Sequence, residues 1–179
     1  MNVFPKNFNQ WVVIHFGAVI HAAAGRTMNI PKNELELRLQ LVDLFKIQKF
    51  SVLATLERTR PYVNLVAFAE TEDLSAIFFA TTRATRKYFN ISAQSGVAML
   101  VDNRSNEIAD LRHAIAVTIM GTASELNGPD REFAEQIYLA KHPHMREFLA
   151  SPTTALMKLE VETFYIVTHF QNVTIFTVK

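Results

Sequence analysis

The 179-residue sequence predicts a mainly β protein of the α+β class, an antiparallel barrel of six to seven strands with peripheral helices. Short apolar runs follow one another with brief polar turns between them, which is typical of sequential hairpins. Strand-like runs outnumber helix-like runs, and the two do not alternate as they do in parallel α/β proteins. Closing the sheet into a barrel would also remove the exposed edges of so long a sheet.

The first predicted element is a helix from Asn33 to about Gln48. Asn33 is the candidate N-cap, and Glu36 stands in the capping-box position three residues later. Apolar residues recur at helical spacing as far as Phe45, so one broad face suits burial against a sheet.

Three strands come next, and the pattern then changes to a short helix and a fourth strand. The strands are predicted at 50–56, 62–69, 76–81 and 97–102, with the helix at 86–94. The first turn is predicted at Arg60–Pro61. Three acidic residues of the second turn are expected to be solvated: Glu70, Glu72 and Asp73. Residues 103–112 form a long polar loop, and such loops in compact domains are often functional.

The last third of the sequence continues the sheet around two helices. A strand is predicted at 114–126, where Gly121 indicates a bulge or sharp bend. Asp130 is the expected cap of the next helix, which covers 130–143. A shorter helix at 144–150 and strands at 155–170 and 173–179 complete the chain, with a turn at Gln171–Asn172.

The composition excludes several kinds of protein. The net charge is +1, so a broad surface for nucleic acid is not expected. There is no cysteine, which excludes disulfides, thiolate zinc sites and cysteine nucleophiles. The sequence contains no Ser-His-Asp ordering, Walker loop or dinucleotide glycine fingerprint.

Residues 1–30 are interpreted as an N-terminal extension and residues 31–179 as the domain. The apolar run from Trp11 to Gly25 has about the length of a signal peptide but is too short to span a membrane. A domain start near Met28 favours a cytoplasmic protein over an exported one, and no membrane association is expected.

The stretch Thr81 to Lys87, TTRATRK, concentrates hydroxyls and cations at the end of a predicted strand. Thr85 can cap the helix that follows, whose free N–H groups favour an anion. Arg86 and Lys87 lie in its first turn, where the helix dipole disfavours cations unless an anion neutralises them. From the residues alone, a phosphate site and an ordinary solvated turn remain equally open.

Three segments in this order resemble the flavin-binding split-barrel superfamily, the pyridoxamine 5′-phosphate oxidase-like proteins. They are RPYVNLVAFAE, AIFFATTRATRKYFNIS and VAMLVDN, and the resemblance covers roughly Leu44 to Glu125. It implies a split β-barrel that binds FMN. The strand past the flavin ring would contribute Val63, Asn64, Leu65 and Val66. The flavin phosphate would contact Thr81, Thr82, Thr85, Arg86 and Lys87.

The resemblance also implies a homodimer in which the partner subunit completes each flavin site. The loop at 103–113 is the candidate for this contact, through Arg104, Arg112 or His113. The end of the chain, YIVTHFQNVTIFTVK, has no Arg or Trp. It therefore departs from the vitamer oxidases, whose C-terminal segment grips the substrate phosphate with these residues.

The function expected is that of an FMN-dependent oxidoreductase acting on an unidentified small molecule, with no catalytic side chain assigned because the flavin carries the redox chemistry. The alternatives are a deazaflavin-dependent reductase, a non-enzymatic protein that sequesters flavin or holds haem through a histidine such as His169 or His113, and a scaffold without cofactor. No metal site is expected, and His142 and His144 are interpreted as surface-loop residues. His169 is expected within a strand, and Phe89 in the core.

Overall fold

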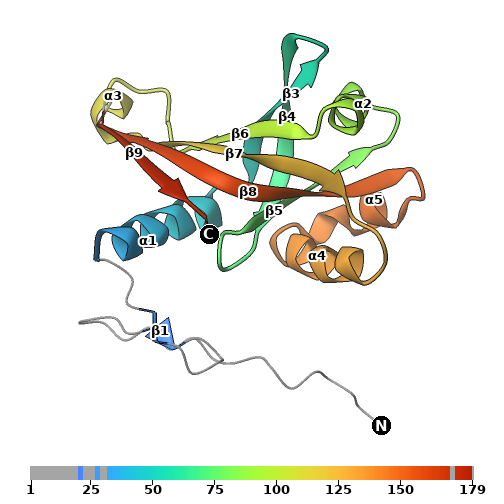
Figure 1. The fold of residues 1–179 in the computed structure, drawn as a ribbon. Coiled ribbons are helices and arrows are strands. Elements are labelled where there is room, and N and C mark those ends of the chain that lie inside the picture. The colour runs from blue at the N-terminus through green and yellow to red at the C-terminus, as the bar shows by residue number, and fades with distance from the viewer. Residues whose placement is uncertain (1–19, 22–26, 29–31, 170–171, 179) are drawn as a thin grey trace. The chain divides into compact units, whose positions relative to one another are not determined.

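A computed structural model (Figure 1) describes most of the chain, namely residues 20–21, 27–28, 32–169 and 172–178. The chain divides into two compact units, Met1–Gln40 and Leu41–Lys179. In the first unit, the short strands β1 (Ile20–His21) and β2 (Thr27–Met28) pair antiparallel. Apart from these two strands, the predicted extension over 1–30 lies outside the described residues.

The second unit contains the strands of one antiparallel sheet. Their bounds are β3 (Phe50–Glu57), β4 (Arg60–Glu70), β5 (Ala76–Thr82), β6 (Gly96–Asp102), β7 (Ala116–Glu125), β8 (Thr154–Thr168) and β9 (Asn172–Thr177). The strands pair in the order β5-β4-β3-β6-β7-β8-β9, and β5 also pairs with β8. That additional pairing closes six strands into the predicted barrel, with β9 as an extra strand beside β8.

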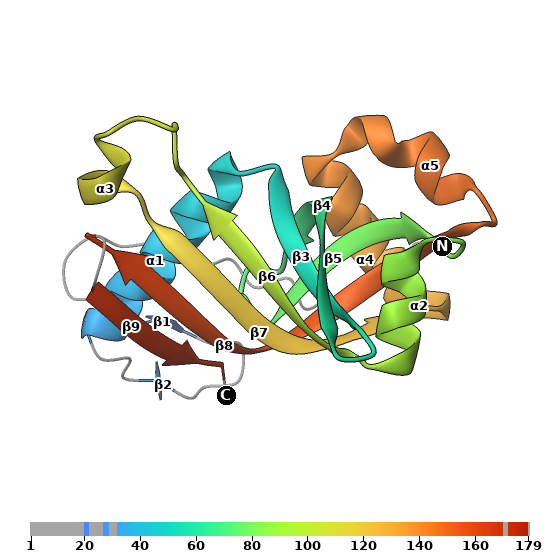
Figure 2. The same cartoon turned by 90° about the horizontal axis from the view of Figure 1, so that it is seen from above.

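The chain also contains five α-helices and one 3₁₀ turn within the described residues. They are α1 (Lys32–Ile47), α2 (Arg86–Ala93), α3 (Asp110–His113), α4 (Gly128–Lys141), the 3₁₀ turn η1 (Pro143–Met145) and α5 (Arg146–Ala150). Figures 1 and 2 show α2 and α5 at one end of the barrel and α3 at the other. None of the described helices has the length and apolarity that crossing a bilayer requires.

Two apolar clusters stabilise the second unit. Phe45 from the end of α1 packs edge-on against Phe68, with ring centroids 5.7 Å apart, and also contacts Phe164. All three rings are fully buried. The second cluster lies under α4 and α5, where Tyr138 and Leu149 are buried with residues of β4, β5 and β8. The helical segment between β7 and β8 is therefore packed firmly onto the barrel.

Gly121 marks the predicted bend. The register between β7 and β8 shifts between Met120 and Gly121. A Cβ atom at Gly121 would collide with the carbonyl oxygen of Glu160, so only glycine permits this close approach of the two backbones.

The barrel is split between β4 and β5. Their pairing covers only Phe68–Glu70 of β4, opposite Ile77–Phe79 of β5. The other edge of β4 pairs with β3 along almost its whole length. The amide of Phe68 donates to the carbonyl of Lys49, beside β3. Because backbone groups alternate along a strand, Pro61, Val63, Leu65 and Ala67 turn theirs toward the split. Pro61, which has no N–H, occupies one of these unpaired positions.

Some element boundaries differ from prediction. The first hairpin turn is Arg58–Thr59, with Arg58 at φ 59°, and the predicted turn at Arg60–Pro61 already belongs to β4. Turns that need positive φ usually contain Gly or Asn, so this one carries no sequence signal. Helix α1 begins at Lys32, which places Asn33 inside its first turn.

Two further predictions concern α4 and the end of the chain. The N-cap position of α4 is occupied by Asn127, and the predicted cap Asp130 lies within the first turn. Strand β8 ends at Thr168, so His169 is an exposed turn residue with φ 49° and not a strand residue. Gln171, predicted in that turn, lies outside the described residues.

Candidate functional site

A groove of about 260 Å³ occupies the split between β4 and β5. Residues of both strands, of the loop before α2, and of the α4–α5 segment line it: Leu65, Val66, Ala67, Ala80, Thr81, Thr82, Thr85, Lys87, Tyr138, Met145 and Phe148. Six of these were predicted as cofactor contacts, namely Leu65, Val66, Thr81, Thr82, Thr85 and Lys87. The structure thus brings the two predicted segments to one place.

Three threonines line the groove, and hydrogen bonds hold the hydroxyls of two of them, Thr81 and Thr85. Thr81 is 3% exposed, and its Oγ1 lies 2.9 Å from Oγ1 of Thr85. Thr85 occupies the N-cap position of α2, but its hydroxyl donates to the carbonyl of Thr82 at 2.8 Å and does not cap the helix. These contacts hold the hydroxyls in fixed positions before any ligand is bound.

The cations of the TTRATRK stretch have different environments. Lys87 lines the groove and forms no ion pair within the described part of the chain. Arg86 instead contacts the β3–β4 hairpin: its Nη1 lies 3.1 Å from Oε2 of Glu57, and its guanidinium is 5.3 Å from the centre of the Tyr62 ring. Of the two predicted phosphate cations, only Lys87 is among the groove residues.

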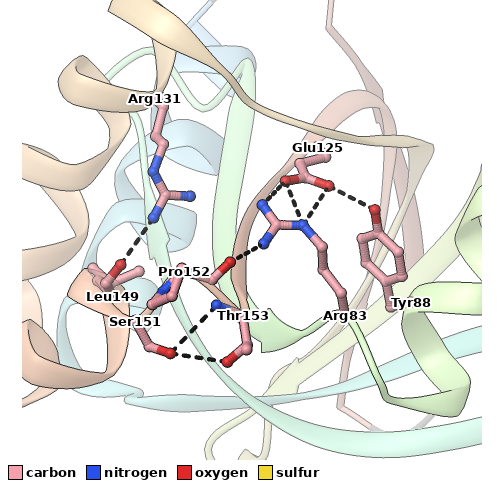
Figure 3. A network of polar contacts seen from close by, with 8 residues as sticks. All are labelled: Arg83, Tyr88, Glu125, Arg131, Leu149, Ser151, Pro152 and Thr153. Atoms are coloured by element: carbon pink, nitrogen blue, oxygen red, sulfur yellow. Dashed lines mark hydrogen bonds and ion pairs between the residues drawn. The ribbon is translucent and has the colours of Figure 1, made fainter.

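Arg83 is held in a network of polar contacts (Figure 3). Its guanidinium forms an ion pair with Glu125, in which Nε donates to Oε1 at 3.1 Å, and its Nη1 donates to the carbonyl of Pro152 at 2.7 Å. The Tyr88 hydroxyl donates to Oε2 of Glu125 at 2.7 Å. Arg83 therefore fastens the loop after β5 to β7 and to the start of β8, and its charge is already neutralised.

The same network sets the ionisation of Glu125. Burial acts to raise the pKa of this carboxyl, but the hydrogen bonds from Arg83 and Tyr88 outweigh burial and lower the pKa below its usual value. Glu125 is thus a carboxylate at neutral pH and a lasting partner for Arg83.

The predicted contacts on β4 are exposed to different degrees. Val63 and Leu65 are 60% and 68% exposed, whereas Val66 is buried. The Asn64 side chain donates to the carbonyl of Val63 at 2.8 Å, and its own Oδ1 is buried without a hydrogen-bond partner in the described residues. Beside the split, β4 therefore offers backbone groups and one side-chain acceptor that are not satisfied by the sheet.

The loop candidates lie far from this groove. Arg112 and His113 are exposed residues of α3, at the end of the barrel opposite α2 in both views (Figures 1 and 2). Asp110 orders the loop by accepting the amides of Ser105, Asn106 and Glu107. These hydrogen bonds, led by that from Ser105, lower the pKa of Asp110. Arg112 and His113 thus do not meet the groove of their own chain.

Sequence reasoning missed Tyr138, Met145 and Phe148. They come from the helical segment between β7 and β8, which was interpreted only as peripheral. Periodicity predicts that these residues pack, but it does not show that the segment reaches over the split. His142 was also misread: it is 2% exposed, with its Nε2 2.8 Å from the carbonyl oxygen of Phe68.

Two other interpretations were wrong. Phe89 is 62% exposed and not part of the core. Glu70 is not a solvated turn residue, because it forms an ion pair with Lys141 in which both side chains are mostly buried. The described residues contain no cluster of three or more histidine or acidic side chains suited to a metal ion.

A second surface feature adjoins the groove. Directly opposed residues form one row across six strands on the outer side of the sheet: Leu65, Val52, Leu100, Thr118, Tyr165 and Ile175. Leu65, Tyr165 and Ile175 are 68%, 39% and 61% exposed. The neighbouring row includes Val63 and Met120, which are also exposed. We call these two rows the outer sheet face. It is an apolar surface of the kind that marks interaction sites.

The sequence matches the pyridoxamine 5′-phosphate oxidase family over residues 37–168. No curated protein matches the sequence of this chain significantly.

Solved structures with the same fold include proteins with different ligands. A haem-binding protein from Mycobacterium smegmatis has 16% identity and a TM-score of 0.70, with 84% of this chain and 60% of that chain covered. This chain therefore spans less than two thirds of the mycobacterial protein. An FAD-binding protein from Mesorhizobium loti has 14% identity and a TM-score of 0.56, with 70% of this chain and 90% of that chain covered.

A third similar structure is a protein from Clostridium acetobutylicum related to general stress protein 26, of the pyridoxinephosphate oxidase family. It has 13% identity and a TM-score of 0.63, covering 80% of this chain and 95% of that chain. At such identities these likenesses establish a common fold.

Proposed function

This chain belongs to the pyridoxamine 5′-phosphate oxidase family, and we propose on that premise that it is an FMN-binding oxidoreductase with its flavin in the groove between β4 and β5. One observation carries the proposal. The groove is lined by the ordered hydroxyls of Thr81 and Thr85 and by Lys87, which forms no ion pair within the described residues, and also by apolar residues of β4 and of the α4–α5 segment. This is the polarity of a molecule with a phosphate on one end and an aromatic ring on the other.

The phosphate would lie at the threonine end. The hydroxyls of Thr81, Thr82 and Thr85 supply hydrogen-bond donors, and Lys87 supplies a point charge that no carboxylate neutralises within the described residues. Arg86 would have to leave Glu57 to reach the phosphate, so we assign it a secondary role.

The flavin ring would lie along the open edge of β4. Val63 and Leu65 turn backbone groups toward the split, and the buried Oδ1 of Asn64 has no hydrogen-bond partner among the described residues. These groups suit the alternating donors and acceptors of the ring's polar edge. The flavin itself supplies the hydride and electron chemistry, and the protein positions it and limits its contact with water. The substrate is an unidentified small molecule.

We also propose that two copies of the chain associate through the outer sheet face. The groove, at about 260 Å³, is smaller than most ligand pockets, which begin at about 300 Å³, and a flavin would need a further wall. Leu65 belongs to both the groove and the outer sheet face, so a subunit packed on that face would supply the wall. Helix α3 of that second subunit, with Arg112 and His113, could then approach the groove of the first subunit across the interface.

The absorbance spectrum of the purified protein, with mass spectrometry of any bound ligand, tests the cofactor. A flavin spectrum and the mass of FMN are expected. A deazaflavin mass would support the reductase alternative. A Soret band would overturn the FMN proposal in favour of haem, although none of the described histidines lines the groove.

Titration of apoprotein with FMN and riboflavin tests the phosphate end. FMN should bind at least a hundredfold more tightly, because riboflavin lacks the group that Lys87 and the threonines recognise. Equal affinity for the two flavins would remove the basis for the assigned orientation.

A further inference from the structure

Tyr138 is a buried tyrosine whose hydroxyl is unused. The side chain is 1% exposed and lines the groove from α4. No residue in the described part of the chain forms a hydrogen bond with its hydroxyl, in contrast to Tyr88, whose hydroxyl donates to Glu125. The oxygen of Tyr138 is not among the fully buried side-chain atoms that lack a hydrogen-bond partner, so the hydroxyl is open to the groove.

Packing alone does not account for this hydroxyl. Tyr138 belongs to an apolar cluster with Phe78, Leu149 and Leu156, where a phenylalanine would fill the same space without a polar atom. The neighbouring His142 ring, 5.0 Å away, uses its Nε2 for the carbonyl of Phe68. A hydrogen-bond partner for the hydroxyl can therefore come from the groove that the residue lines.

The position of Tyr138 in the groove indicates which part of a ligand it would meet. The threonines and Lys87 come from β5, the following loop and α2, and are the polar part of the lining. Tyr138 comes from α4 and shares its side of the groove with Met145 and Phe148. On this apolar side, a ligand's acceptor oxygen would find few protein donors.

We propose that the Tyr138 hydroxyl donates a hydrogen bond to an acceptor oxygen in the ring or ribityl portion of the bound flavin, the part that FMN and riboflavin share. The inference rests on the proposed function and adds a recognition residue to it. Burial raises the pKa of Tyr138 to about 12, so the hydroxyl keeps its proton at neutral pH and acts as a donor.

Tyr138→Phe tests this proposal, because it removes one oxygen and leaves the ring in place. Affinity for FMN and for riboflavin should each fall about tenfold, which corresponds to about 1.4 kcal/mol. The ligand-free variant should be as stable as the wild type, because the ring stays packed and no hydrogen bond within the described residues is lost. A loss of flavin affinity without a loss of stability distinguishes ligand recognition from a structural role.

Two matched variants complete the experiment. Tyr62→Phe removes a hydroxyl from a half-buried tyrosine that neither lines the groove nor belongs to the outer sheet face, and should leave both affinities unchanged. Lys87→Met should weaken FMN much more than riboflavin, because it acts on the phosphate end.

Each alternative result has a distinct meaning. Unchanged flavin affinity in Tyr138→Phe, or a less stable ligand-free variant, would overturn the inference and leave the proposed function standing. A loss for FMN without a loss for riboflavin would place Tyr138 at the phosphate and also overturn it. If the wild-type protein binds neither flavin, the proposed function and this inference both fail.

Discussion

Lys141 and Glu70 form an ion pair, with Nζ of Lys141 2.6 Å from Oε2 of Glu70 and side-chain exposures of 12% and 15%. The same ammonium donates to the carbonyl of Phe45 at 2.8 Å and lies 3.9 Å from the centre of the Phe68 ring. One side chain thus fastens the end of α4 to β4 and to the end of α1. Burial lowers the pKa of Lys141, and the hydrogen bond from its ammonium to Glu70 partly offsets this effect.

Removing one partner of this pair should cost more than removing both. Glu70→Gln leaves a mostly buried ammonium without its counter-charge and should lower the free energy of unfolding by about 3 kcal/mol. Glu70→Gln combined with Lys141→Met should cost less, because no charge remains buried. Urea denaturation measures both, and a double variant less stable than the single one would contradict the argument.

His142 should make stability depend on pH. Burial lowers its pKa below the ordinary 6.5, and the hydrogen bond to the Phe68 carbonyl only partly opposes burial, with Lys141, Lys49 and His144 nearby disfavouring the charge further. The unfolded chain therefore takes up a proton before the folded chain does. The stabilising contribution of neutral His142 is complete above pH 6.5, and it is lost as the pH falls through the lower pKa of His142 in the folded protein.

The variant His142→Gln checks this prediction by thermal unfolding between pH 7.5 and 5. Wild-type stability should decline over this range more steeply than that of the variant. Parallel curves would show that other groups cause the pH dependence.

Gly121 should not tolerate a side chain. Gly121→Ala brings a methyl group against the carbonyl oxygen of Glu160 and should destabilise the protein by about 2–3 kcal/mol. Gly96→Ala is the matched control, because no atom lies within 4 Å of a Cβ at that position. It should change stability by about 0.5 kcal/mol or less. Chemical denaturation that found equal costs would refute the steric explanation.

The two adjacent cations of α2 should contribute unequally to FMN binding. Lys87→Ala should weaken FMN by about ten- to a hundredfold, the value of a charge-assisted contact. Arg86→Ala should change affinity by no more than about threefold, since Arg86 already pairs with Glu57 at an exposed site. Fluorescence titration of both variants with FMN measures the two losses of affinity. A larger loss in Arg86→Ala than in Lys87→Ala would place the phosphate near Arg86.

A charge in the outer sheet face should separate the proposed subunits. Met120, 40% exposed, lies on that face, and Met120→Arg should shift the protein to a monomer with reduced flavin affinity. Phe133→Arg alters an apolar residue of α4 that is 55% exposed and outside the two rows of that face, and should leave the dimer intact. Sedimentation of both variants tests the interface, and an unchanged mass for Met120→Arg would exclude it.

The fold was predictable because the local sequence patterns agree with the strand order of the whole barrel. Alternating apolar runs specified the hairpins, and Gly121 marked the bend. The missed turn at Arg58–Thr59 has no glycine or asparagine, so its positive φ is imposed by the pairing of β3 with β4 and not by its own residues.

The site was predictable only in part. The TTRATRK stretch gathers donors within a few positions, so composition reveals it. The three cations Arg83, Arg86 and Lys87 differ in whether a carboxylate pairs with them. Glu125 pairs with Arg83 and Glu57 with Arg86, and both carboxylates come from other strands. Tyr138 joins the site through the packing of α4 over the split, a tertiary contact that leaves no periodic signal in the sequence.

The closing pairs of the barrel join segments that are far apart in the chain. Ile77 pairs with Leu159 and Thr82 with Thr154, so β5 acquires its second neighbour only after β6, β7 and the α4–α5 segment have been made. Until then the β3–β4–β5 meander exposes strand edges, and forming the closing pairs requires a long loop to be ordered first. Barrel closure should therefore be a late step in folding, and variants that slow it should aggregate during synthesis even when the finished protein is stable.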